Sequence, residues 1–141
     1  MANTVNVTVL ENGPRNALVH VYLRSDGSTG ELVNVTLIDP FALVTSGTPG
    51  ALGMEKNARL LLGRIEYNYA GFDSVLSFGS GTVPPNYKWV LTQGANCPVD
   101  FTRFTNLFDN SGLDGTECLN ITTTGFNNTA CQGSMLIQVI K

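Results

Sequence analysis

Charge is scarce in this sequence of 141 residues, because Asp, Glu, Lys and Arg together make up only 13% of it. Soluble domains typically contain about twice that share. Lysine occurs at Lys56, Lys88 and Lys141 only. The polar surface must therefore consist largely of Asn, Thr, Ser and Gly, whose neutral groups leave water more easily than charged groups do. This composition favours a surface that neighbouring molecules cover, although small β-proteins are also often rich in Thr and Gly.

Basic clusters, long apolar runs and an export signal are missing as well. The eight Lys and Arg residues are scattered and the net charge is −3, which argues against binding to nucleic acid. No run approaches the roughly 18 apolar residues of a membrane span, so no membrane is expected as a partner. The start MANTVNVTVLENG lacks the basic and apolar regions of a signal peptide, and we expect synthesis in the cytoplasm.

The groups that usually carry chemistry are few. His20 is the one histidine, and it lies in a strand-like run with no partner for catalysis or for a metal. Nucleophile motifs are absent, and prolines follow the Gly-rich segment 78–82, so this segment indicates a turn and not a phosphate site. The acidic segment 109–117 does not match a calcium loop, although a nonstandard Ca²⁺ site stays open. The sequence therefore predicts no enzyme, no cofactor and no metal site.

The chain has three cysteines, Cys97, Cys118 and Cys131. An odd number without an export signal argues against a disulfide scaffold. A single bridge between Cys118 and Cys131 remains an open alternative.

Alternation of apolar and polar residues with period two dominates the chain, as expected for half-buried β-strands. It is clearest over Val5–Val9, Ala17–Leu23, Val33–Leu37 and Met135–Val139. No segment shows a strong helical period, and turn-forming residues separate eight or nine short strands. The sequence predicts an all-β fold, in which residues 1–141 form a single β-sandwich or jelly-roll-like domain.

Asn16–Pro40 is predicted to form a β-hairpin, because two apolar-rich runs flank a polar stretch of Ser, Asp, Gly and Thr. In Ala17–Leu23 the odd-numbered residues should face one side and the even-numbered residues the other. In the second run, Val33, Val35 and Leu37 should share one face.

Arg59–Tyr69 is predicted to be a strand with a bulge at Gly63, and a loop is expected through Cys97 and Pro98. Residues 39–57 lack any period and form a long apolar loop, a kind of loop that is often functional. It either folds over its own core or packs on a partner. We expect it to contact a neighbouring chain.

The whole chain resembles a family of small virion structural proteins of tailed bacteriophages. The resemblance is carried by NGPRNALVHVYL at Asn12–Leu23, SDGSTGELVNVTLIDP at Ser25–Pro40 and VDFTRF at Val99–Phe104, and by a closing strand that ends in Lys141. It implies a virion component without enzymatic activity. Capsid decoration (cement) proteins are commonly small β-domains, and a decoration protein is the favoured member of the family.

The predicted function is therefore to stabilise the head by binding the major capsid protein or other virion proteins on its outer surface, after synthesis in the host cytoplasm. We expect a homo-oligomer, with a trimer favoured. The alternatives are a neck, tail or fibre-associated component, or a carbohydrate-binding β-sandwich module. An open platform formed by Tyr22, Tyr67, Tyr69 and Trp89 would favour the carbohydrate-binding module.

The predicted partner interface combines an edge strand with the long loop. No Lys, Arg or Pro blocks the edge of the first strand, Thr4–Leu10, and an unpaired edge invites pairing by another chain. The predicted interface residues are Val5, Val7 and Val9 in the strand and Phe41, Leu43, Val44, Leu52 and Met54 in the loop.

Overall fold

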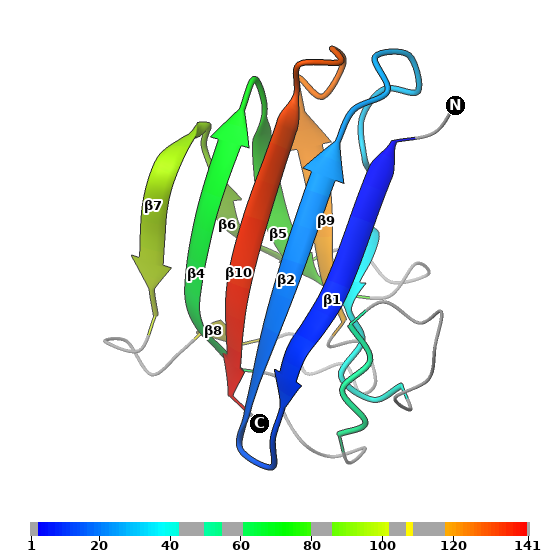
Figure 1. Ribbon diagram of the computed structural model, residues 1–141. Coiled ribbons are helices and arrows are strands. Elements are labelled where there is room, and N and C mark those ends of the chain that lie inside the picture. The colour runs from blue at the N-terminus through cyan, green and yellow to red at the C-terminus, as the bar shows by residue number, and fades with distance from the viewer. Residues whose placement is uncertain are drawn as a thin grey trace.

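The computed structural model describes residues 3–42, 50–54, 61–79, 86–101, 107–108 and 118–140. These residues form two antiparallel β-sheets that pack face to face (Figure 1). No helix occurs among the described residues, so none is long and apolar enough to cross a membrane. The predicted all-β sandwich is confirmed.

The two sheets have the strand order of a jelly roll with one strand added. The larger sheet runs β1 (Thr4–Asn12), β2 (Asn16–Arg24), β10 (Gln132–Ile140), β4 (Leu61–Ala70) and β7 (Gly94–Asp100), and β8 (Leu107–Phe108) also pairs with β4. The smaller sheet runs β3 (Val35–Ile38), β9 (Leu119–Thr124), β5 (Asp73–Phe78) and β6 (Asn86–Leu91). The orders β2-β10-β4-β7 and β3-β9-β5-β6 are those of the two jelly-roll sheets, and β1 is added at one edge.

The predicted alternation of β2 is confirmed in the structure. Ala17, Val19, Val21 and Leu23 are buried in the core, whereas the residues between them are partly exposed. β10 alternates in the same way. Side chains from both sheets meet in one hydrophobic core cluster, and this cluster is the main stabilising element of the sandwich.

Asn16–Pro40 is not a hairpin, which corrects the prediction. β2 belongs to the larger sheet and β3 to the smaller, so the polar stretch between them crosses from one sheet to the other (Figure 1). Asn34 adopts a left-handed φ of 47°. This turn breaks the alternation, and Val33 is consequently 66% exposed and does not share the inward face of Leu37.

β4 contains the predicted bulge, because the pairing with β10 skips Gly63 between Leu62 and Arg64. The predicted loop through Cys97 and Pro98 is instead part of strand β7. β7 lies at the edge of its sheet, where a proline is tolerated because one side of the strand needs no hydrogen-bond donors.

The described part of the long loop lies against its own core. Asp39 and Ala51 form a parallel bridge, and the Met54 amide donates to the Pro40 carbonyl at 2.7 Å. A Cβ atom on Gly50 would lie only 2.1 Å from the Leu37 carbonyl oxygen. A side chain at residue 50 would therefore push the loop off β3.

Candidate functional site

The strand predicted as an interface, β1, lies at an edge of the larger sheet. Val5, Val7 and Val9 turn toward the sandwich and pack against the core, so their side chains are only partly available to a partner. Within the described residues, the backbone of Thr4–Glu11 pairs with β2 alone. Its outer side therefore presents free N–H and C=O groups, beside an outward Leu10 that is 53% exposed.

The predicted loop residues have different surroundings. Phe41 and Met54 are half-buried, whereas Leu52 is only 2% exposed and belongs to the core. Leu43 and Val44 lie outside the described residues. Leu52 thus has a core role in place of the predicted contact role, and contact through Phe41 stays a prediction.

A second exposed edge, β6, escaped the sequence analysis. Trp89 is 43% exposed and Val90 58%, and the Trp89 ring meets Phe101 edge-on with centroids 5.2 Å apart. The run Trp89–Leu91 holds the signal, because three consecutive apolar residues in a strand must turn one side chain outward. Exposed Trp residues are common anchors in protein interfaces.

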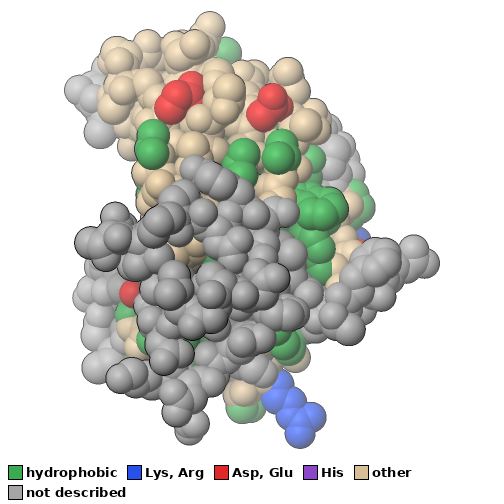
Figure 2. All heavy atoms as spheres, turned by 180° about the vertical axis from the view of Figure 1, so that it is seen from behind, with side chains coloured by type: hydrophobic (Ala, Val, Ile, Leu, Met, Phe, Trp, Pro, Cys, Tyr) green, Lys and Arg blue, Asp and Glu red, His purple; other side chains and the backbone are tan. Residues whose placement is uncertain are grey.

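Figure 2 shows the molecule from behind, where isolated acidic and basic side chains stand among neutral ones. The visible described surface is thus largely uncharged, as the composition predicts.

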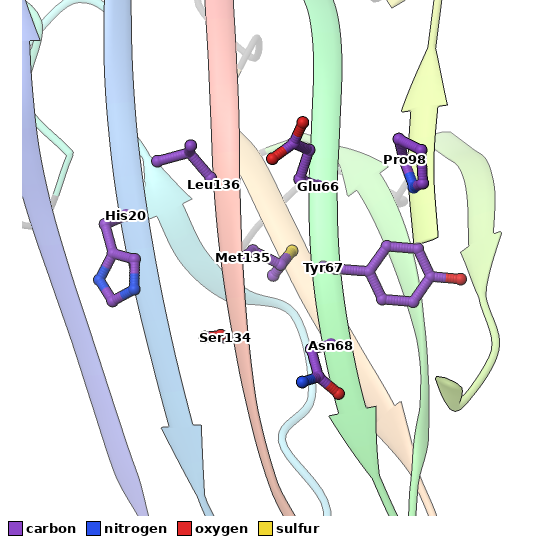
Figure 3. Close-up of a pocket in the computed structure, with 8 residues that line it drawn as sticks. All are labelled: His20, Glu66, Tyr67, Asn68, Pro98, Ser134, Met135 and Leu136. Atoms are coloured by element: carbon purple, nitrogen blue, oxygen red, sulfur yellow. The ribbon is translucent and has the colours of Figure 1, made fainter. Parts of the chain in front are cut away.

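The outer face of the larger sheet, turned away from the core, carries a groove. Three adjoining hollows of about 390, 420 and 440 Å³ lie on this face, and neighbouring hollows share lining residues. Figure 3 shows the central hollow, lined by residues of β2, β10, β4 and β7. The groove follows β10, the middle strand.

Strand register explains the shape of the groove. Ser134 of β10 pairs with Tyr22 on one side and Asn68 on the other, and Leu136 pairs with His20 and Glu66. Directly opposite residues of antiparallel strands share a face. The small Ser134 therefore forms a low floor between two longer side chains.

Reactive groups are not assembled in the groove. Among the described residues no three His, Cys, Asp or Glu side chains could hold a metal ion together. The Arg64 Nη2 and Glu66 Oε1 atoms form an ion pair at 3.0 Å, which neutralises both charges. In the row across the sheet, Thr8 and Leu136 flank His20.

Cys118 and Cys131 are free thiols and do not form the bridge left open above. Burial raises the pKa of the Cys118 thiol to about 11, and the nearby Asp39 adds to the effect. The thiol is therefore protonated at neutral pH and is a weak nucleophile.

The aromatic side chains do not form the open platform that would favour a carbohydrate-binding module. Tyr67 and Tyr69 are 8% and 3% exposed and lie in the core. Tyr22 is on the outer face of the larger sheet, and Trp89 belongs to the smaller sheet.

The described features that are open to another molecule include the edge of β1, the edge of β6 with Trp89 and Val90, and the groove along β10. The edges suit contact with proteins, because unpaired strands can extend a neighbouring sheet. The function must be argued from these features, because no family model and no curated protein matches the chain.

Proposed function

We propose that the protein is a non-enzymatic virion structural component, a capsid decoration protein that binds the major capsid protein on the outer surface of the head. The observation that carries the proposal is the nine-residue edge strand β1, which is uncharged from Thr4 to Leu10. Native proteins usually block such an edge with Lys, Pro or a covering segment. An open, uncharged edge strand suits a protein whose edge is covered by a partner protein when it functions.

The exposed apolar side chains support the same role. Among the described residues four large hydrophobic side chains are exposed, and three of them, Leu10, Trp89 and Val90, belong to edge strands. Partner contact would remove these side chains from water together with the unpaired backbone groups. A neck, tail or fibre-associated component would use the same surfaces.

Strong binding to a capsid can come from many identical contacts. A specific interface buries roughly 800 Å² on each partner, and a shell presents the same epitope many times. A homo-oligomer, with a trimer favoured, would engage several capsomers at once and gain avidity without any new contact. Few charges would be paired, so we expect the capsid affinity to change little with salt.

The test mixes the purified protein with capsids that lack it and measures binding by pull-down and imaging across a salt series. Thr8→Lys places a charge on the outward face of β1 without entering the core. His20→Lys is the matched control, because His20 lies directly opposite Thr8 on the neighbouring strand β2.

We expect Thr8→Lys to weaken capsid binding by about tenfold or more, since a charge at an edge opposes strand pairing. His20→Lys should bind as the unmodified protein does. Full binding by Thr8→Lys, or an affinity that collapses as salt rises, would contradict the edge-strand proposal. Equal losses in the two variants would instead locate the contact on the sheet face.

A further inference from the structure

We propose that the groove along β10 binds a neutral oligosaccharide, an activity separate from capsid binding. The three hollows extend along a strand of nine residues, which at about 3.3 Å per residue is roughly 30 Å long. An elongated chain of several sugar units fits such a groove better than a compact ligand does.

Several polar side chains that line the groove have no hydrogen-bond partner among the described residues. This holds for the side chains of His20, Tyr22, Asn68, Ser134 and Gln138. Together they present hydroxyl, amide and imidazole groups, which include both donors and acceptors.

Several polar side chains elsewhere are used by the fold itself. The Asn3 amide donates to the Gly30 carbonyl at 2.8 Å, the Asn120 amide to the Gly79 carbonyl at 2.9 Å, and the Thr123 hydroxyl to Glu31 at 2.8 Å. The five polar side chains of the groove named above are not used in this way, so they can bind a ligand.

The chemistry of the groove disfavours other classes of ligand. The backbone groups of its strands are paired with neighbouring strands, so a peptide laid in it would find no strand edge to extend. Glu11, which lines one end of the groove, and a net charge of −3 oppose nucleic acid phosphates. Arg64 is paired with Glu66, so the residues that line the groove include no unpaired Lys or Arg to attract an anionic ligand.

A sugar chain matches what remains. Sugar hydroxyls both donate and accept hydrogen bonds, as the side chains of the groove do. The half-exposed Tyr22 ring can cover one apolar face of a sugar ring while its hydroxyl stays polar. The contact would use hydrogen bonds and one aromatic ring, in contrast to a stacking platform.

The test titrates the isotopically labelled full chain, free of capsids, and follows its amide resonances by NMR. The probes are soluble hexasaccharides of β-1,4-linked glucose, α-1,4-linked glucose, β-1,4-linked mannose and β-1,4-linked N-acetylglucosamine. An uncharged peptide of similar length and a short oligothymidylate represent the other ligand classes.

We expect at least one hexasaccharide to shift resonances of β2, β10 and β4. Asn68→Ala should weaken that binding by about tenfold, since it removes hydrogen bonds to the ligand. Ser134→Trp should abolish it by filling the floor of the groove. Thr124→Ala, at an exposed position of β9 in the other sheet, is the matched control and should bind normally.

Asn68 is exposed, so its variant keeps the test valid even if Ser134→Trp does not fold. The proposal is overturned if no hexasaccharide shifts any resonance, if the shifts surround Trp89, or if the peptide or oligothymidylate occupies the groove instead. Because capsids are absent from the experiment, each of these outcomes leaves the proposed capsid function standing.

Discussion

The substitution Gly133→Ala tests how tightly the aromatic part of the core is packed. Gly133 lies in β10, and a Cβ atom added to it would lie 2.5 Å from Cδ1 of Tyr69 and 3.0 Å from Cζ of Phe72. Carbon atoms in contact are normally about 3.5–4.0 Å apart, so the Tyr69 ring would have to withdraw by about 1 Å. It is held on two sides, by stacking on Phe72 at 4.5 Å and by a hydrogen bond with the Ser74 hydroxyl at 2.9 Å.

The expected cost follows from these contacts. Overpacking a core by one methyl group costs about 1–3 kcal/mol, and loss of the buried Tyr69–Ser74 hydrogen bond would add about 1–3 kcal/mol. Replacing Gly by Ala also lowers the conformational entropy of the unfolded chain, which stabilises the folded protein by about 0.4–1 kcal/mol. We therefore expect Gly133→Ala to lower the free energy of unfolding by about 2–4 kcal/mol, measured by urea denaturation. A chain of this size should then melt about 5–15 °C lower.

Gly63→Ala is the matched control, because Gly63 is also buried in a strand of the same sheet. Its added Cβ would meet the flexible ends of two side chains, Ile140 at 3.2 Å and Gln138 at 3.6 Å, so we expect a change below about 1 kcal/mol. Adding Tyr69→Leu to Gly133→Ala should cost less than the sum of the two single changes, since a smaller side chain relieves the clash. If Gly133→Ala had the same melting temperature as the unmodified protein, the packing argument would be refuted.

Three further predictions concern pH and the core. Burial raises the pKa of Tyr69 well above its ordinary value, so the free energy of unfolding should fall as the pH rises above about 10. In Tyr69→Phe this fall with pH should be shallower. The variant also removes the hydrogen-bond partner of Ser74. Hydrogen bonds from the Thr29 hydroxyl and backbone lower the pKa of Asp26 to about 2. The Asp26 carboxylate therefore stabilises the fold above its unfolded pKa of 3.8, and this stabilisation is lost as the pH falls toward 2. Between pH 3.8 and 2 the melting temperature of Asp26→Asn should depend less on pH than that of the unmodified protein. Leu52→Ala should cost about 2–5 kcal/mol in urea denaturation, whereas a near-neutral result would favour the contact role predicted from the sequence.

The sequence predicts which side chains of a strand are buried, but it does not predict which strands pair with each other. Apolar residues at every second position in β2 specify which side chains are buried, and Gly63 marks a bulge, because both are local properties of the chain. The polar stretch after Arg24 fits a hairpin turn as well as a crossing between sheets. The alternation of apolar and polar residues does not indicate which sheet the next strand joins. It also does not reveal the left-handed backbone conformation of Asn34.

The open edge of β1 could be anticipated because uncharged residues are visible in the sequence. The groove could not, since Tyr22, Asn68 and Ser134 belong to three strands that lie far apart along the chain. Only the register of β10 between β2 and β4 brings them into one row. The run Trp89–Leu91 indicates that one of its side chains faces outward, but it does not show that β6 lies at the edge of its sheet.

The central place of β10 in its sheet has a consequence for biosynthesis. β10 separates β2 from β4 and follows β2 by roughly a hundred residues, so at about 5–20 residues per second the ribosome needs on the order of 5–20 s to supply it. Until then only the pairs β1–β2, β4–β7 and β4–β8 of that sheet can form, and the facing edges of β2 and β4 stay open. The nascent chain thus passes through a state with two half-sheets whose unpaired edges are prone to aggregate. Chaperone supply should therefore limit the yield of folded protein more than its final stability does.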